Sequence, residues 1–181
     1  MTFDTKKLTL YPIQMDDYQK SWGGVDYKIF LMENFPEMCA DYNFTDVTDA
    51  DTLRMLYMSS PDNVYVVSGV VSGEIVFYNA HAGESATLTS FTVSLRKTDD
   101  VASNETTLGS KTSAVGDSIA AETYQTYPFF FDVDASDDAK HVKKLEYMLL
   151  YLSIDHTGGN LKFSHANDSS SKDLIINIPI L

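Results

Sequence analysis

Residues 143–154 read KKLEYMLLYLSI and are followed by a Gly-Gly pair at 158–159, the short segment LKF at 161–163 and the C-terminal run LIINIPIL at 174–181. This is the most apolar part of the sequence, and no catalytic or ligand-binding motif lies in it. The Gly-Gly pair predicts a turn between two strands. Further strand patterns begin at Val64 and can pack against this stretch, which therefore indicates an all-β fold.

A helix is the alternative for the beginning of this stretch. Five apolar residues between 142 and 152 fall on one helical face, with Ser136 or Asp137 available as a cap. The aromatic content and the following Gly-Gly turn favour a strand from about Leu145 instead. We therefore expect a strand there, and we place Leu149 in the core.

Strand patterns separated by turn signals continue back to Val64. Residues 64–71 form a nearly continuous β-branched run, and residues 91–95 alternate between large apolar and polar side chains. The polar segment 97–105 predicts a connection to a return strand at 106–112. Together with the C-terminal stretch, these patterns give about eight strands, which predicts a jelly-roll-like antiparallel β-sandwich.

One of these strands contains a proline. Residues Tyr124–Val133 include the segment YPFFF, in which Pro128 predicts an edge position or a bulge because proline cannot donate a backbone hydrogen bond. We expect Phe130 to belong to the core.

Residues 1–60 differ in composition, because they contain six of the seven methionines. We expect them to form an N-terminal docking or extension region, and residues 61–181 to form a β-sandwich domain with a core of its own. Flexible thioethers suit an adaptable contact surface, although they also fill gaps at the margin of a core. Segment 48–58 fits a short helix or a strand, and we expect a strand. The expected interface residues are Tyr11, Met15, Tyr18 and Trp22.

Charge and composition exclude several classes of partner. The formal net charge is -13, and no cluster of Lys and Arg offers the footprint that binding to nucleic acid phosphates requires. No apolar run approaches the length of a membrane span, and the first residues do not resemble a signal peptide. We therefore expect neither nucleic acid nor membrane as a partner. The single cysteine, Cys39, excludes an intramolecular disulfide and fits a buried, inert thiol.

The order of these segments resembles a known class of protein. SGVVSGEI at 68–75, a strand at 89–96, YPFFF at 127–131, DHTGGN at 155–160 and a last apolar strand are similar to the jelly-roll sandwich of virion proteins from tailed phages and related archaeal viruses. Their head-decoration and minor structural subunits are the most similar. The resemblance covers residues 64–181 and lies in strand order and spacing, without a signature residue.

The resemblance implies a non-enzymatic structural protein that decorates the outside of a capsid. It further implies synthesis in the host cytoplasm, location on the virion, the major capsid protein as partner, and assembly into a symmetric oligomer, for which we expect a trimer. A carbohydrate- or receptor-binding module of a tail or fibre is the alternative. That function needs aromatic side chains exposed together, for which Tyr124, Tyr127 and Tyr151 are the candidates.

Two segments resemble catalytic blocks of lipases and esterases. Gly116-Asp117-Ser118-Ile119 is similar to their nucleophile block, and Asp138-Ala139-Lys140-His141 is similar to their Asp-x-x-His block. Such a nucleophile needs a strand-to-helix turn and a base within hydrogen-bond reach. No apolar strand precedes Ser118, so we expect a polar loop and no catalytic residue.

An acidic segment carries the weak candidates for a metal site. Asp132, Asp134 and Asp138 are spaced like the first ligands of a calcium loop, but the sixth position is Asp137 and the twelfth is Lys143. This excludes an EF-hand and leaves a solvated turn, with a looser calcium site between strands as the alternative. The four histidines have no partners at metal-ligand spacing, so we expect them on the surface and expect no cofactor. They are His81, His141, His156 and His165.

Overall fold

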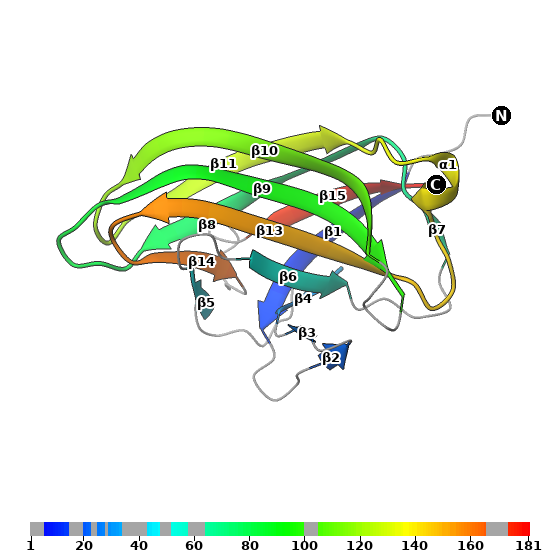
Figure 1. Cartoon of the computed structure of the whole chain (residues 1–181), viewed down its shortest axis with the longest axis horizontal. Coiled ribbons are helices and arrows are strands. Elements are labelled where there is room, and N and C mark those ends of the chain that lie inside the picture. The colour runs from blue at the N-terminus through cyan, green and yellow to red at the C-terminus, as the bar shows by residue number, and fades with distance from the viewer. Residues whose placement is uncertain are drawn as a thin grey trace.

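The computed structural model describes residues 6–14, 20–22, 25–27, 29–33, 43–47, 52–57, 64–99, 105–165 and 174–181. These residues contain fifteen strands and one short helix, which build an elongated, curled molecule (Figure 1). Before residue 64 the strands are β1 (Lys6–Gln14), β2 (Lys20–Trp22), β3 (Val25–Tyr27), β4 (Ile29–Met32), β5 (Asn43–Asp46) and β6 (Thr52–Tyr57). The following elements are β7 (Tyr65–Val66), β8 (Val70–Asn79), β9 (Ala86–Thr98), β10 (Thr106–Ile119), β11 (Tyr124–Asp132), α1 (Asp137–Lys140), β12 (His141–Val142), β13 (Tyr147–Thr157), β14 (Leu161–His165) and β15 (Ile175–Ile180).

Strand β1 belongs to two sheets. Its residues 6–10 pair with β15, whereas its residues 11–14 pair with β4. The first sheet continues from β15 to β8, where β15 and β14 share one edge and β11 pairs along the other. The second sheet has the order β10, β9, β13, β6, β4, β1. All these pairings are antiparallel except β4 with β6, so the predicted all-β, antiparallel, jelly-roll-like fold is confirmed.

The core lies between the two sheets. Phe77 of β8 and Tyr127 of β11 face Phe91 of β9, with ring centroids 6.3 and 5.8 Å apart across the gap. On β15, every second residue is buried, as expected for a strand with one face toward a core. Burial of these apolar side chains on both inner faces holds the sheets together.

The C-terminal stretch forms a strand, as predicted. Strand β13 pairs with β9 on one side and with β6 on the other, so its backbone groups are used by neighbouring strands rather than by a helix. Only α1, one turn long with Ser136 as its N-cap residue, is helical among the described residues here. The predicted turn at Gly158 and Gly159 is also present, with positive φ at both residues. It connects the two sheets rather than two paired strands, because β14 pairs with β8.

The core extends across the expected boundary at residue 60. Leu8 and Leu10 of β1, Ile29 of β4 and Met55 of β6 are buried in the same apolar cluster as the later strands. Residues on both sides of residue 60 therefore contribute to one apolar cluster, and the expected division into a docking region and a sandwich domain stays a prediction. The expected strand in segment 48–58 is confirmed as β6.

The side chains of the Phe129–Phe131 run that face the core are not the ones predicted from the sequence. Phe129 and Phe131 point into the core, whereas Phe130 lies between them on the outer face and is 68% exposed. Strand alternation permits only two of the three consecutive rings to share a face. The expected core position of Phe130 is therefore wrong. The predicted edge position of Pro128 is correct, because β11 pairs with β8 alone among the described strands.

Leu149 is fully buried, but outside the main cluster. It lies opposite Leu56, which in turn lies opposite Phe30, and all three are fully buried. Met148 and Leu150, its neighbours on β13, point into the main cluster. These three side chains therefore form a second apolar row on the other face of the sheet.

Truncating the buried side chains should separate core from surface. We expect Phe129→Ala and Leu149→Ala each to lower the free energy of unfolding by about 2–5 kcal/mol, because each leaves a cavity. Phe130→Ala removes an exposed ring and should change it by less than about 1 kcal/mol. Urea unfolding followed by circular dichroism measures all three, and an equal loss in Phe129→Ala and Phe130→Ala would contradict the strand phase described above.

Candidate functional site

The two segments that resemble catalytic blocks lie at opposite ends of β10. The carbonyl oxygen of Leu108 accepts hydrogen bonds from the backbone N–H groups of Asp134 and Ala135, at 3.1 and 3.2 Å, just before α1 and His141. Ser118 lies ten residues further along the same strand, roughly 30 Å away, so the expected polar loop around it is wrong. Figure 1 shows β10 running from the end of the molecule that holds α1 to the opposite end. A hydrogen-bonded pair of Ser118 and His141 is therefore excluded by this geometry.

The acidic segment after β11 does not gather its carboxylates. Asp132, Asp134 and Asp138 are all exposed, and Asp137 forms a 3.4 Å ion pair with Lys140. Among the described residues, no three His, Cys, Asp or Glu side chains stand close enough to hold a metal ion. This segment is a solvated acidic turn in the structure.

The histidines have separate structural roles. The ring nitrogen Nδ1 of His81 accepts hydrogen bonds from the backbone N–H groups of Gly83 and Glu84, at 3.1 and 2.8 Å, in an exposed turn. His141 is exposed as expected, and the side chain of His165 lies outside the described residues. His156 contradicts the expected surface position: it is only 7% exposed, and its Nε2 lies 2.9 Å from the carbonyl oxygen of Val47.

The three candidate tyrosines do not form one exposed cluster. Tyr127 is buried in the core. Tyr124 is half-buried on β11 and stacks on Tyr78, with ring centroids 4.5 Å apart. Tyr151 lies on the other sheet. Among the aromatic side chains that the structure describes, Phe130, which was expected in the core, is the most exposed.

Both arginines of the chain lie beside Tyr151. The guanidinium carbon of Arg96 is 3.8 Å from the ring centroid of Tyr151, and that of Arg54 is 5.4 Å away. Glu105 binds both arginines, at 2.6 Å to Arg96 and 3.4 Å to Arg54. Because the carboxylate and the ring already engage both guanidinium groups, this cluster ties β6, β9 and β13 to the start of β10.

An exposed apolar surface surrounds Phe130. This Phe130 face consists of Val70 and Ser72 of β8 and Pro128 and Phe130 of β11, which are neighbours in the register, with Glu74 at its margin. A shallow groove of about 450 Å³ runs beside Phe130 and reaches Ile175 and Asn177 of β15.

Gly73 of β8 lines this groove at a position of close contact. A Cβ atom at Gly73 would lie 2.1 Å from the carbonyl oxygen of Ile175 and 2.6 Å from Cζ of Phe129, so no side chain fits there. The absence of a side chain lets β15 and the ring of Phe129 approach the backbone of β8 closely.

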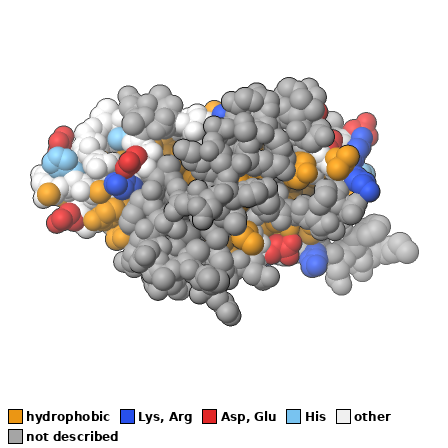
Figure 2. All heavy atoms as spheres, turned by 90° about the horizontal axis from the view of Figure 1, so that it is seen from below, with side chains coloured by type: hydrophobic (Ala, Val, Ile, Leu, Met, Phe, Trp, Pro, Cys, Tyr) orange, Lys and Arg blue, Asp and Glu red, His pale blue; other side chains and the backbone are white. Residues whose placement is uncertain are grey.

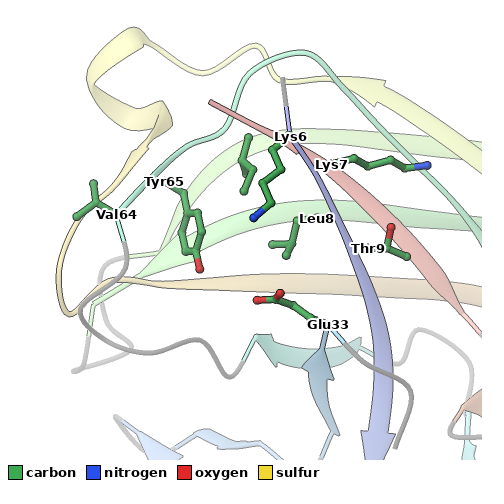
Figure 3. A pocket seen from close by; sticks show the side chains of 8 residues that line it. Lys6, Lys7, Leu8, Thr9, Glu33, Val64 and Tyr65 are labelled. Carbon is green, nitrogen blue, oxygen red and sulfur yellow. The ribbon is translucent and has the colours of Figure 1, made fainter. Parts of the chain in front are cut away.

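A second hollow lies where β1 begins and β15 ends. This end pocket has a volume of about 530 Å³ and is lined by Lys6, Lys7, Leu8, Thr9, Glu33, Val64, Tyr65 and Ile180. In Figure 3, Lys6 and Tyr65 lie beside Leu8 with Glu33 below them, whereas Lys7 points away from them. The hydroxyl of Tyr57, which is almost completely buried, donates a hydrogen bond to the carboxylate of Glu33. Burial of Tyr57 raises the pKa of its phenol, and the hydrogen bond to Glu33 raises it further, so this hydroxyl remains a donor.

Most of the expected interface residues cannot be placed. Met15 and Tyr18 lie outside the described residues, and Trp22 is described only as part of the backbone of β2. Cys39 lies outside them as well. Tyr11 is half-buried on β1, opposite Met32 of β4. The docking role expected of these residues stays a prediction.

Charged side chains of both signs are visible on one face of the molecule. On the face shown in Figure 2, acidic and basic side chains appear at both ends of the molecule, with hydrophobic side chains among them. Within the part of the chain that the structure describes, no helix is long and apolar enough to cross a membrane.

No family model and no curated protein matches the sequence. The structure is similar to a CocE/NonD family hydrolase from Staphylococcus aureus (8% identity, TM-score 0.65) and to an aminopeptidase from a marine sediment archaeon of the Thaumarchaeota (9% identity, TM-score 0.66). In both comparisons, 98% of this chain is covered. The chain spans 37% of the length of each of these two proteins.

A structure of infectious bursal disease virus, Gx strain, matches with a lower TM-score. It shares 12% identity and a TM-score of 0.33, with 99% of this chain and 58% of that chain covered. At these identities, the similarities to the hydrolase and the aminopeptidase show a shared β fold and nothing about activity. The similarity to the virus structure, with its TM-score of 0.33, carries no argument of its own.

The core tyrosine Tyr127 makes the stability of the fold sensitive to alkali. Burial raises the pKa of Tyr127 from 10.0 to about 12, and the negative charge of Asp117 contributes to this rise. Above pH 10 the unfolded chain loses this proton while the folded chain keeps it, so stability should be intact below pH 10 and fall as the pH rises toward 12. Urea midpoints across this range test the expectation. Tyr127→Phe should flatten the decline, whereas Tyr124→Phe should not, and identical slopes in all three proteins would refute it.

Proposed function

We propose that this chain is a non-enzymatic structural subunit that docks on the outside of a viral capsid through the Phe130 face. The observation that carries the proposal is the 68% exposure of Phe130 beside an open groove. A phenylalanine on a sheet face contributes roughly 1.5–3 kcal/mol when a partner removes it from water. Aromatic rings beside grooves are the anchors on which protein interfaces concentrate their binding energy.

The surroundings of Phe130 support docking to a protein surface. Val70, diagonal to Phe130 in the register, is 52% exposed, and Pro128 is exposed on the same face of β11. Glu74 and Asp132 are exposed at the margin. An apolar centre with a polar margin is the usual composition of a protein interface.

The charge of the chain supports a place on the outer surface of a particle. At a net charge of -13, contact with packaged DNA would bring like charges together. The described carboxylates of the turn at residues 132–138 are exposed, in line with a surface turned toward solvent.

The partners follow from the resemblance to virion proteins. We propose the major capsid protein as the surface that receives Phe130, and a symmetric homo-oligomer, with a trimer as the expected state. The N-terminal residues Tyr11, Met15, Tyr18 and Trp22 are the proposed additional contacts. A carbohydrate- or receptor-binding module of a tail or fibre is the second candidate function, and the polar end pocket is the observation that favours it.

Placing a charge at Phe130 should abolish docking without unfolding the protein. Phe130→Asp replaces the apolar anchor by a carboxylate that the partner would have to desolvate, so binding to empty capsids should fall by at least about tenfold. Thr107→Asp adds the same charge at an exposed site of β10 and serves as the control. Co-sedimentation with capsids measures binding, and circular dichroism verifies the fold. Normal binding of Phe130→Asp would place the interface elsewhere.

Docking through apolar contacts should resist salt. Salt above physiological strength screens exposed ion pairs within a few Å but leaves apolar contacts intact. We expect the subunit to stay on particles washed at rising salt, with or without a chelator. Release by salt alone would indicate an electrostatic interface, and release by a chelator alone would make Asp132, Asp134 and Asp138 calcium ligands.

A further inference from the structure

We infer that the end pocket binds a hydroxylated organic anion of the sugar-acid class. The pocket combines a lysine from β1, a glutamate that follows β4, a tyrosine from β7 and Ile180 of β15, so four segments of the chain build it. Its volume of about 530 Å³ lies within the range of about 300–1,000 Å³ that is typical of small-molecule sites. It is accordingly large enough for one sugar ring.

The charge of the lining favours an anion. Of the two lysines that line the pocket, Lys7 points away from Tyr65 and Leu8 (Figure 3), so Lys6 is the cation that faces a ligand, on a chain whose total charge is -13. Among the described residues, neither Lys6 nor Lys7 takes part in an ion pair, and the ammonium group of Lys6 lies on the side of Tyr65 and Leu8 (Figure 3). Lys6 is thus available to pair with a ligand carboxylate.

Glu33 is prepared for a hydroxyl rather than for a second cation. One of its carboxylate oxygens already accepts the hydrogen bond from Tyr57, whose buried position fixes the glutamate against the sandwich. The other oxygen can accept a hydrogen bond from a ligand hydroxyl. A ligand ammonium group would be repelled by Lys6, so a zwitterion is disfavoured.

The remaining lining residues suit the ring of a sugar ligand. Tyr65 is half-buried, and its ring centroid lies 6.4 Å from that of Tyr57, so its ring has a neighbour that restricts its position. Leu8 and Ile180, both nearly buried, supply the apolar lining. An aromatic ring beside an apolar surface, with polar groups of both signs at its margin, accommodates the C–H face of a sugar and orients its hydroxyls and carboxylate.

Titration of the full chain with D-glucuronate tests this inference. We expect saturable shifts in two-dimensional amide NMR spectra, confined to residues 6–9, 33 and 64–65 and their neighbours, and weakened by salt because Lys6 is exposed. D-Glucose carries the hydroxyls without the carboxylate, and propionate carries the carboxylate without the hydroxyls. Both should bind more weakly than D-glucuronate.

Three substitutions locate the interactions. Lys6→Gln should weaken D-glucuronate binding by about tenfold, because a charge-assisted hydrogen bond is lost. Glu33→Gln should weaken it as well while leaving propionate unaffected or more tightly bound. Lys111→Gln, which removes an exposed charge on β10, should bind like the wild type. The inference is overturned if the wild type shows no saturable shifts, if glucose or propionate binds as tightly as glucuronate, or if Lys6→Gln and Glu33→Gln both bind normally. These outcomes are independent of capsid docking, which the Phe130→Asp experiment measures separately.

Discussion

The whole sandwich depends on the hydrogen bonding of β1 to two different sheets. Five of its residues pair with β15 and the next four pair with β4, so one continuous strand turns the corner between the layers. Each paired residue of β1 provides hydrogen bonds for backbone N–H and C=O groups that would otherwise be exposed to solvent at a sheet edge. Because the strand is shared, the layers cannot separate on this side without breaking one of the two ladders. The apolar cluster between them is closed here by backbone pairing as well as by side-chain packing.

Local pattern predicted the strands of residues 64–181 well, and it failed where partners are distant in the sequence. The β9–β10 hairpin and the choice of strand over helix for β13 follow from alternation, aromatic content and turn residues. The role of residues 6–14 does not, because nothing within them states that they pair with residues 176–180. Methionine content suggested a contact surface, whereas Met55 fills the core, the alternative that the sequence analysis had left open for these methionines.

Side-chain direction was the second limit. Three consecutive phenylalanines show no alternation of apolar and polar residues. The sequence therefore could not decide whether Phe130 or its two neighbours face the core. His156 lies in a polar segment of the sequence. Its buried hydrogen-bond partner is the carbonyl oxygen of Val47, 109 positions earlier, which no local pattern indicates. The end pocket was not foreseen for a similar reason: Lys6, Glu33 and Tyr65 form no motif along the chain, and only the topology brings them together. The adjacent residues Lys6 and Lys7, on a chain of net charge -13, are the sequence signal that could have indicated it.

The pairing of β1 with β15 also sets the order in which the chain can acquire its structure. The side chain of Thr9 donates a hydrogen bond to that of Asn177, 168 positions later in the sequence. During synthesis, the edge of β1 that pairs with β15 therefore stays unpaired until nearly all of the described sequence has left the ribosome. Contacts of such long sequence range slow folding, since the entropy of loop closure is lost before the contacts are gained. Until then, Leu8 and Leu10 of the nascent chain lack neighbours that bury them in the folded protein. Apolar residues exposed in this way favour chaperone binding and aggregation.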